Sequence, residues 1–270
     1  MGIGAAIAEC FARSGAAVSI LDIDGDAASS LAERLVADGH RVVSFTGDVS
    51  SASEAERMIL DSVSALGGLN VLVNNAGIQP KSSNVRVEDL DETTWDRVID
   101  VNLKGQFLMS KFSIPYIRQQ GGGTIINIAS VQGLQSRTKV PVYAASKGGI
   151  LSLTRNMALD YVKDNIRVVA INPGAIPDTS LGLSAAEIQG RTGDGLKVQS
   201  DTNHNLDWVN TVGGRPTGNP YDIGTVAVFL ASNAASFITG ESINVDGGAM
   251  AIGAWALESR SVLGPPESDG

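Results

Sequence analysis

The chain has 270 residues, of which 43 % are hydrophobic, and its formal net charge is −9. That length and apolar content are enough to bury the core of one globular domain. The negative charge argues against nucleic acid and against an anionic membrane as partners. Cys10 is the only cysteine, which excludes an internal disulfide, and His40 and His204 lack the spacing of a metal-binding pair. Because no apolar run has the length of a membrane span, we expect a cytoplasmic protein without a metal.

Short apolar runs alternate with longer helical patterns along the whole chain. The expected strands cover residues 17–21, 41–45, 69–73, 124–129, 166–171 and 242–245. The expected helices cover residues 4–14, 26–38, 51–66, 95–119, 142–162 and 221–232, and Pro115 interrupts the longest of them late. This alternation predicts an α/β protein with a doubly wound, Rossmann-like parallel sheet.

The chain is expected to form one domain over residues 1–248, followed by a tail at 249–270 rich in Gly, Pro and Ser. Within the domain, a polar and irregular segment covers about residues 175–219. Loops of such length inside a compact domain are usually functional, so this segment is interpreted as a lid over a substrate.

Ser130, Tyr143 and Lys147 form the most informative group of polar residues. Tyr143 and Lys147 have the spacing Tyr-x-x-x-Lys on an expected helix, which places both side chains on one face. An ammonium beside a phenol lowers the pKa of the phenol, so Tyr143 could exchange a proton with an alcohol. Ser130 follows an apolar strand at the carboxyl end of the sheet, where open α/β sheets bind ligands. Without further motifs, the Tyr and Lys would be interpreted as an ordinary pair on a helix surface.

Further motifs accompany this group in a fixed order. They are Gly2-Ile3-Gly4, Asp22, Asp48-Val49, Asn74-Asn75-Ala76-Gly77, Val101-Asn102, Asn172-Pro173-Gly174 and Val245-Asp246-Gly247-Gly248. With Ser130, Tyr143 and Lys147 they resemble the short-chain dehydrogenase/reductase family from Gly2 to Gly248. The resemblance implies a sheet of seven parallel strands, an NAD-dependent alcohol dehydrogenase or ketone reductase, and pairing of subunits into homodimers or homotetramers.

The resemblance also implies a role for each matching residue. Tyr143 is the expected acid/base, Ser130 orients the substrate, Lys147 binds the ribose, and Asn102 holds a water of the proton relay. The expected cofactor contacts are Gly2, Ile3, Gly4, Asp22, Asp48, Val49, Asn75, Ala76, Gly77, Tyr143, Lys147, Pro173, Gly174, Ile176 and Thr179. The family often has a Thr four positions after Gly174, whereas this chain has Asp178 there and Thr179 one position later.

Gly2 and Gly4 resemble the end of the family's glycine-rich turn, where missing side chains let the backbone approach a pyrophosphate. The first strand of the family, and the Thr and first Gly of that turn, have no counterpart in the printed sequence. We therefore expect a fold that lacks its first, central strand as given. An upstream extension that supplies this strand is expected to raise both stability and affinity for NAD.

Asp22 comes directly after an expected strand, where a carboxylate accepts hydrogen bonds from the adenosine ribose of NAD. No Arg or Lys lies between Gly15 and Ser30, so a ribose phosphate would meet no cation there. The sequence thus favours NAD over NADP. Asp48 is expected to face the adenine, with a simple turn-forming Asp as the alternative.

The expected reaction is hydride transfer between a secondary alcohol and the nicotinamide. A sugar or polyol is favoured, because Asp178, Arg191, Asn203 and His204 in the lid suit a hydroxyl-rich substrate. The segment 140–149 and the tail resemble sugar-oxidising members such as L-fucose and L-rhamnose dehydrogenases, and their hydroxysteroid relatives. A hydroxysteroid or cyclic-alcohol dehydrogenase, or a catalytically silent dinucleotide-binding protein, is the alternative.

Overall fold

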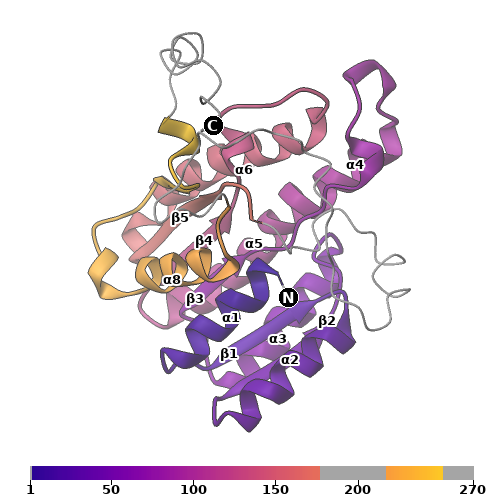
Figure 1. Ribbon diagram of the computed structural model, residues 1–270. Helices are drawn as coiled ribbons and strands as arrows, with labels where there is room; N and C mark the ends of the chain where they lie inside the picture. The colour runs from indigo at the N-terminus through magenta and orange to yellow at the C-terminus, as the bar shows by residue number, and fades with distance from the viewer. Residues whose placement is uncertain (1, 177–216, 252–270) are drawn as a thin grey trace, which may run out of the picture.

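A computed structural model describes residues 2–176 and 217–251 of the chain (Figure 1). The strands are β1 (Val18–Asp22), β2 (Val42–Thr46), β3 (Val71–Asn74), β4 (Gly123–Ile128), β5 (Ile166–Pro173) and β6 (Ser242–Val245). The α-helices are α1 (Ile3–Arg13), α2 (Gly25–Ala37), α3 (Ala52–Leu66), α4 (Glu92–Ile99), α5 (Gly105–Gln119), α6 (Pro141–Asp160) and α8 (Pro220–Ala231). These elements confirm the predicted α/β alternation.

All paired strands are parallel, and they form two hydrogen-bonded sheets. β1 pairs with β2, while the other four strands follow the order β3-β4-β5-β6. In the described residues no hydrogen bonds join β1 to β3, the position in the strand order at which the family resemblance implies one more strand. The carboxyl ends of the strands bring Asp22, Asn75, Ser130 and Gly174 toward one end of the molecule.

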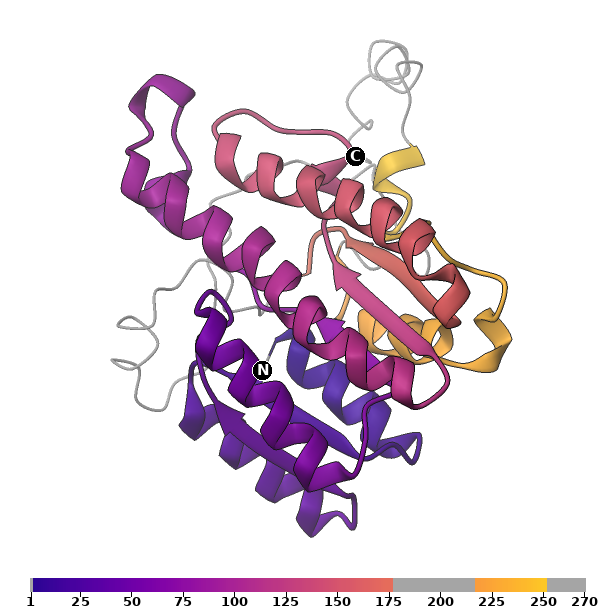
Figure 2. The ribbon, with the colours of Figure 1, turned by 180° about the vertical axis from the view of Figure 1, so that it is seen from behind.

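Helices cover both faces of the sheets. α1 packs against α8 on the face seen in Figure 1, and α3 packs against α5, with α6 beside them, on the face seen in Figure 2. Adjacent residues of β4 serve the two layers, because successive side chains of a strand point to opposite faces. Ile125 packs with α3, α5 and α6, whereas Ile126 packs with α1 and α8, and both are fully buried. Such continuous apolar runs are typical of a parallel sheet covered on both sides.

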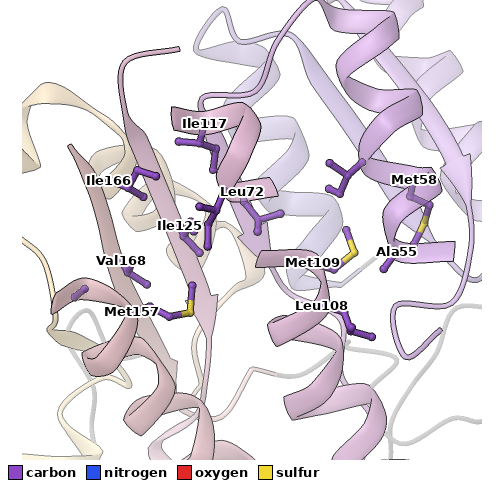
Figure 3. Close-up of a cluster of buried hydrophobic side chains, with 13 residues drawn as sticks. Ala55, Met58, Leu72, Leu108, Met109, Ile117, Ile125, Met157, Ile166 and Val168 are labelled. Atoms are coloured by element: carbon purple, nitrogen blue, oxygen red, sulfur yellow. The ribbon is translucent and has the colours of Figure 1, made fainter. Parts of the chain in front are cut away.

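Figure 3 shows the larger of these layers. Leu72, Ile125, Ile166 and Val168 from the strands lie in one cluster with Met58 of α3 and with side chains of α5 and α6. This packing fixes α5 and α6 against β4. It thereby also fixes the side chains of these helices that lie near the carboxyl ends of the strands.

Polar side chains define where helices begin. Asp24 accepts a hydrogen bond from the Ala27 amide at the start of α2, and Asp91 does the same for the Thr94 amide at the start of α4. α8 begins with a capping box formed by Asn219 and Asp222. Each cap satisfies an amide that the helix itself leaves without a partner.

The helix predicted at 95–119 differs from the structure in one respect. It consists of α4, a π-helical turn (η3, Asp100–Lys104) and α5, and α5 continues through Pro115. A proline removes one amide donor and bends a helix, but packing against a core can hold the helix together, as it does here. The π-helical turn is the more consequential feature, because such turns occur at functional sites and this one contains Asn102.

One buried carboxylate ties three helices together. Glu9 of α1 is almost completely buried and accepts hydrogen bonds from Arg34 of α2 and from the Tyr221 hydroxyl of α8, the latter at 2.5 Å. Burial alone would raise the pKa of Glu9, but the hydrogen bonds from Tyr221 and Arg34 and the charges of Arg34 and Arg13 together hold the pKa below its ordinary value of 4.5. Glu9 therefore links α1, which belongs to the β3–β6 half, to α2 beside β1 and β2.

Replacing Glu9 with glutamine is expected to lower the free energy of unfolding by about 1–3 kcal/mol, because it weakens charge-assisted hydrogen bonds. A carboxyl group with a lowered pKa stabilises the fold above its unfolded pKa and loses that contribution as the pH falls through the folded pKa. The difference between wild type and E9Q in urea unfolding should thus be largest near neutral pH and shrink below pH 4.5. A difference that stays constant down to pH 3 would contradict the ionic role of Glu9.

The described residues contain neither a membrane-spanning helix nor a metal-binding group of side chains. No helix in them combines the length and the hydropathy that crossing a bilayer requires. The same residues hold no group of three or more His, Cys, Asp or Glu side chains arranged to bind a metal ion.

Candidate active site

Ser130, Tyr143 and Lys147 meet beside the carboxyl end of β4. Ser130 follows the strand, Tyr143 lies in the first turn of α6, and Lys147 lies one turn later. The Ser130 side chain interacts with the Tyr143 hydroxyl and acts to lower the pKa of that phenol. Lys147 Nζ donates to the backbone oxygen of Ile128 at 2.8 Å and lies 5.6 Å from the centre of the Tyr143 ring. The structure therefore brings together the three residues that the sequence singled out.

Backbone contacts make this arrangement possible. Ser130 Oγ accepts a hydrogen bond from the Gln132 amide at 3.1 Å, which closes the turn after β4. At Gly133 in the same turn, a Cβ atom would lie 2.8 Å from the backbone carbon and oxygen of Lys147. Only a glycine lets this turn lie directly on α6, and the sequence analysis overlooked Gly133.

Burial sets the protonation of the pair. Tyr143 is 5 % exposed, and this burial raises its pKa to about 12, although the hydrogen bond with Ser130 and the charge of Arg137 act in the opposite direction. Lys147 is 2 % exposed, and burial lowers the pKa of its ammonium to about 8. The expected effect of the Lys147 ammonium on the pKa of Tyr143 does not outweigh this desolvation, and Nζ is itself hydrogen-bonded to the Ile128 oxygen.

Asn102 joins the segment after β3 to this group. Its Oδ1 accepts from the Ile78 amide at 2.7 Å, and its Nδ2 donates to the Ile78 oxygen at 3.0 Å and to Ser146 Oγ at 3.2 Å. At Gly77, a Cβ atom would lie 3.4 Å from Asn102 Oδ1 and 3.6 Å from Lys147 Nζ. The segment containing Asn75, Ala76 and Gly77 is thus held next to Asn102 and Lys147.

A buried polar network supports the site from below. Asn74 Nδ2 donates to Ser110 Oγ and to Asn127 Oδ1, and Asn127 Nδ2 donates to Thr154 Oγ1, all within 3.0 Å. These bonds tie β3 and β4 to α5 and α6. Networks in which each member is hydrogen-bonded specify one packing arrangement, so these bonds fix the two strands against α5 and α6.

The N-terminus of α1 fits a phosphate group. Gly2 precedes the helix in an extended conformation, no side chain caps the first turn, and no acidic residue lies in it. At Gly4, a Cβ atom would lie 2.6 Å from Asn75 Nδ2, so the absence of a side chain lets α1 begin close to the Asn75 segment. Uncapped amides at a helix N-terminus attract anions, which agrees with the expected pyrophosphate contact of Gly2, Ile3 and Gly4.

Asp22 and Asp48 lie at the carboxyl ends of β1 and β2, two strands that pair with each other. Asp22 ends β1 and is exposed, and its Oδ1 accepts from the Asp24 amide at 3.0 Å. Asp48 Oδ1 accepts from the amide and the hydroxyl of Ser50, so one carboxylate oxygen of Asp48 stabilises a turn. Val49 contacts the start of α5, where a Cβ atom on Gly105 would lie 2.8 Å from Val49 Cγ2.

The structure describes the residues after β5 up to Ile176. At Gly174, a Cβ atom would lie 2.7 Å from the Cα atom of Asp246, so the two chain segments approach each other only because residue 174 is a glycine. Pro173 ends the strand, and the amide of Gly218 donates to the Ala175 oxygen next to Ile176. Thr179, Asp178, Arg191, Asn203 and His204 lie outside the described residues.

The sequence of this chain is similar to those of known proteins over nearly its whole length. The family model described as enoyl-(acyl carrier protein) reductase matches residues 1–250. The chain is 37 % identical to 2-(S)-hydroxypropyl-CoM dehydrogenase 3 of Xanthobacter autotrophicus over 251 residues, which is 93 % of each chain. It is 32 % identical to 3beta-hydroxysteroid dehydrogenase 2 of Eggerthella lenta over 248 residues, 92 % of this chain and 90 % of the relative.

A solved structure of a gluconate 5-dehydrogenase from Burkholderia cenocepacia, in complex with NADP and tartrate, superposes with a TM-score of 0.80. The two sequences are 30 % identical, and the match covers 94 % of this chain and 92 % of the other. The chain belongs to the short-chain dehydrogenase/reductase family. As a member, it is an NAD(P)-dependent oxidoreductase that acts on the CH–OH groups of alcohols.

Sequence reasoning missed Ser146, Gly133 and Asn127. Ser146 could have been found from its spacing, since it lies three positions after Tyr143 and directly before Lys147, on the helix face that carries the active pair. Asn127 gave a weaker signal, a single polar residue inside an apolar strand. Buried polar residues in such positions nearly always have hydrogen-bond partners, which only the tertiary structure identifies.

Proposed function

We propose that this chain oxidises a secondary alcohol with NAD, and that its substrate is a sugar or another polyol. The observation that supports the reaction is that the buried Tyr143 hydroxyl interacts with the Ser130 side chain and lies one helical turn from Lys147. Tyr143 takes the hydroxyl proton of the alcohol in oxidation and returns it to the carbonyl oxygen in reduction. Ser130 holds the same substrate oxygen, and the Lys147 ammonium favours the deprotonated state of Tyr143.

NAD, when bound, accepts the hydride from the alcohol carbon. The backbone amides of Gly2, Ile3 and Gly4 would hold its pyrophosphate. The Asp22 carboxylate would hold its adenosine ribose. The Asn75–Gly77 segment and Lys147 would hold the nicotinamide half, since Gly77 lies close to Lys147 Nζ. Asn102 fixes this segment through both backbone atoms of Ile78, and it retains acceptor capacity for a water of the proton relay.

Two features support a hydroxyl-rich substrate. The segment 177–216 contains Asp178, Arg191, Asn203 and His204, and a polyol needs several such directional partners. The similar protein from Burkholderia is named for the oxidation of gluconate. A hydroxysteroid is the alternative, supported by the relative from Eggerthella.

The test is NADH formation by the purified chain with a panel of sugars, sugar acids, cyclic alcohols and steroids. We expect turnover with polyols and much slower turnover with steroids. The reverse order would overturn the substrate class. A chain that NAD stabilises against thermal unfolding, but that oxidises no alcohol of the panel, would be a dinucleotide-binding protein instead.

Asp22→Ser is expected to lower the ratio of kcat/KM with NAD to kcat/KM with NADP at least about tenfold, because it removes a ribose acceptor and a charge that repels the ribose phosphate. Asp26→Ser is the matched control, since Asp26 is also exposed and lies in the first turn of α2. Both cofactors are measured with the same alcohol. A wild-type chain that prefers NADP would contradict the assignment of Asp22.

A further inference from the structure

Ser146 is completely buried in α6, between Tyr143 and Lys147. Its hydroxyl donates to the backbone oxygen of Tyr143 at 2.7 Å. The single hydrogen of the hydroxyl is then in use, so its oxygen can serve the surroundings only as an acceptor. Asn102, in the π-helical turn, donates from its Nδ2 to the Ser146 oxygen at 3.2 Å.

These bonds determine which way the amide of Asn102 points. Because Ser146 Oγ needs a donor, the nitrogen of Asn102 faces α6, and its second hydrogen reaches the Ile78 oxygen. The Asn102 oxygen then faces the Ile78 amide, which donates to it. A flipped amide would set oxygen against the Ile78 carbonyl and leave Ser146 without a donor, so the hydroxyl selects one orientation.

The connection joins the two halves of the proposed active site. α6 carries the proton-transfer residue Tyr143, and the segment ending at Ile78 carries the expected nicotinamide contacts. Ile78 is hydrogen-bonded to the side chain of Asn102, and in the described residues that side chain is in turn hydrogen-bonded to Ser146 of α6. Asn102 and Ser146 thus link this segment to α6. A misplacement of about 1 Å between reacting groups can lower a rate about a hundredfold.

We propose that Ser146 is a positioning residue, which holds Asn102 and thereby sets the Ile78 segment against the helix that carries Tyr143 and Lys147. This inference rests on the proposed function of the same site. Ser146 does not touch the substrate, so its loss should change the rate of the chemical step more than the binding of the alcohol.

The experiment compares Ser146→Ala with Ser113→Ala, using the alcohol of the panel that wild type oxidises fastest. Ser113 is an equally buried serine, and its Oγ has no hydrogen-bond partner in the described part of the chain. We expect S146A to lower kcat about tenfold and to change KM for the alcohol less than about twofold. S113A should keep kcat within about twofold of wild type, and Ser146→Thr, which restores a hydroxyl, should recover most of the lost rate.

A double-mutant cycle with Asn102→Ala separates positioning from simple loss of stability. If Ser146 acts through Asn102, S146A should lower kcat less than about twofold in the N102A background. Should S146A melt below the assay temperature, Ser146→Cys takes its place, because a thiol of similar size is only a weak acceptor.

Three outcomes would overturn the inference. If wild type is active and S146A is as fast as S113A, the role of Ser146 is overturned and the proposed function stands. An S146A effect as large in the N102A background as in wild type would do the same. A wild type that oxidises no alcohol would overturn the proposed function, and the role of Ser146 with it.

Discussion

Tyr143→Phe is expected to lower kcat at least about a hundredfold in both directions of the reaction, because the variant lacks the hydroxyl that exchanges a proton with the substrate oxygen. The ring stays in place, so the midpoint of thermal unfolding should change little. The measurement is steady-state turnover with saturating NAD and alcohol, together with thermal unfolding of both proteins.

Tyr116→Phe is the matched control for that variant. Tyr116 is a partly buried tyrosine of α5 that packs against the larger core cluster, away from Ser130 and Lys147. It should retain nearly full activity. A Y143F variant with near-normal turnover would show that another group transfers the proton.

Lys147→Met is expected to have the second-largest effect, lowering kcat for oxidation roughly tenfold to a hundredfold near neutral pH. Burial places the pKa of Tyr143 at about 12, so oxidation needs a nearby cation to favour the deprotonated phenol. Without the ammonium, the pH at which oxidation becomes fast should move upward, and NAD should bind more weakly. An unchanged pH profile and an unchanged Kd for NAD would contradict this role.

The same variant has a stability signature that does not depend on activity. The pKa of Lys147 is lowered from 10.5 to about 8, so between these pH values the unfolded chain binds a proton that the folded chain has lost. The free energy of unfolding of wild type should therefore rise, relative to K147M, as the pH increases from about 8 to 10.5. Lys163→Met, at an exposed lysine, should show no such trend.

In wild type, the lowered pKa of Lys147 also predicts the pH dependence of ketone reduction. Below pH 8 the ammonium is charged and Tyr143 is protonated, which suits proton delivery to a carbonyl oxygen. Above pH 8 Lys147 loses its charge, and reduction should slow.

The sequence by itself determined the alternation of strands and helices, because buried strands appear as apolar runs such as Ile125-Ile126 and helices as periodic patterns with polar starts. It also placed Tyr143 and Lys147 on one face of α6, since their spacing is a property of one helix. Predicted and observed strand bounds differ by only one or two residues, with β4 and β5 as examples.

Only the tertiary structure decided how those residues behave. The pKa values of Tyr143 and Lys147 depend on how completely the surrounding layers exclude water, and no local pattern contains that quantity. The π-helical turn at Asn102 and the hydrogen bonds of Ser146 and Asn127 likewise depend on partners 24 to 53 positions away in the chain. Hydrogen bonds between distant segments follow from packing, so the sequence names the candidates and the fold selects their partners.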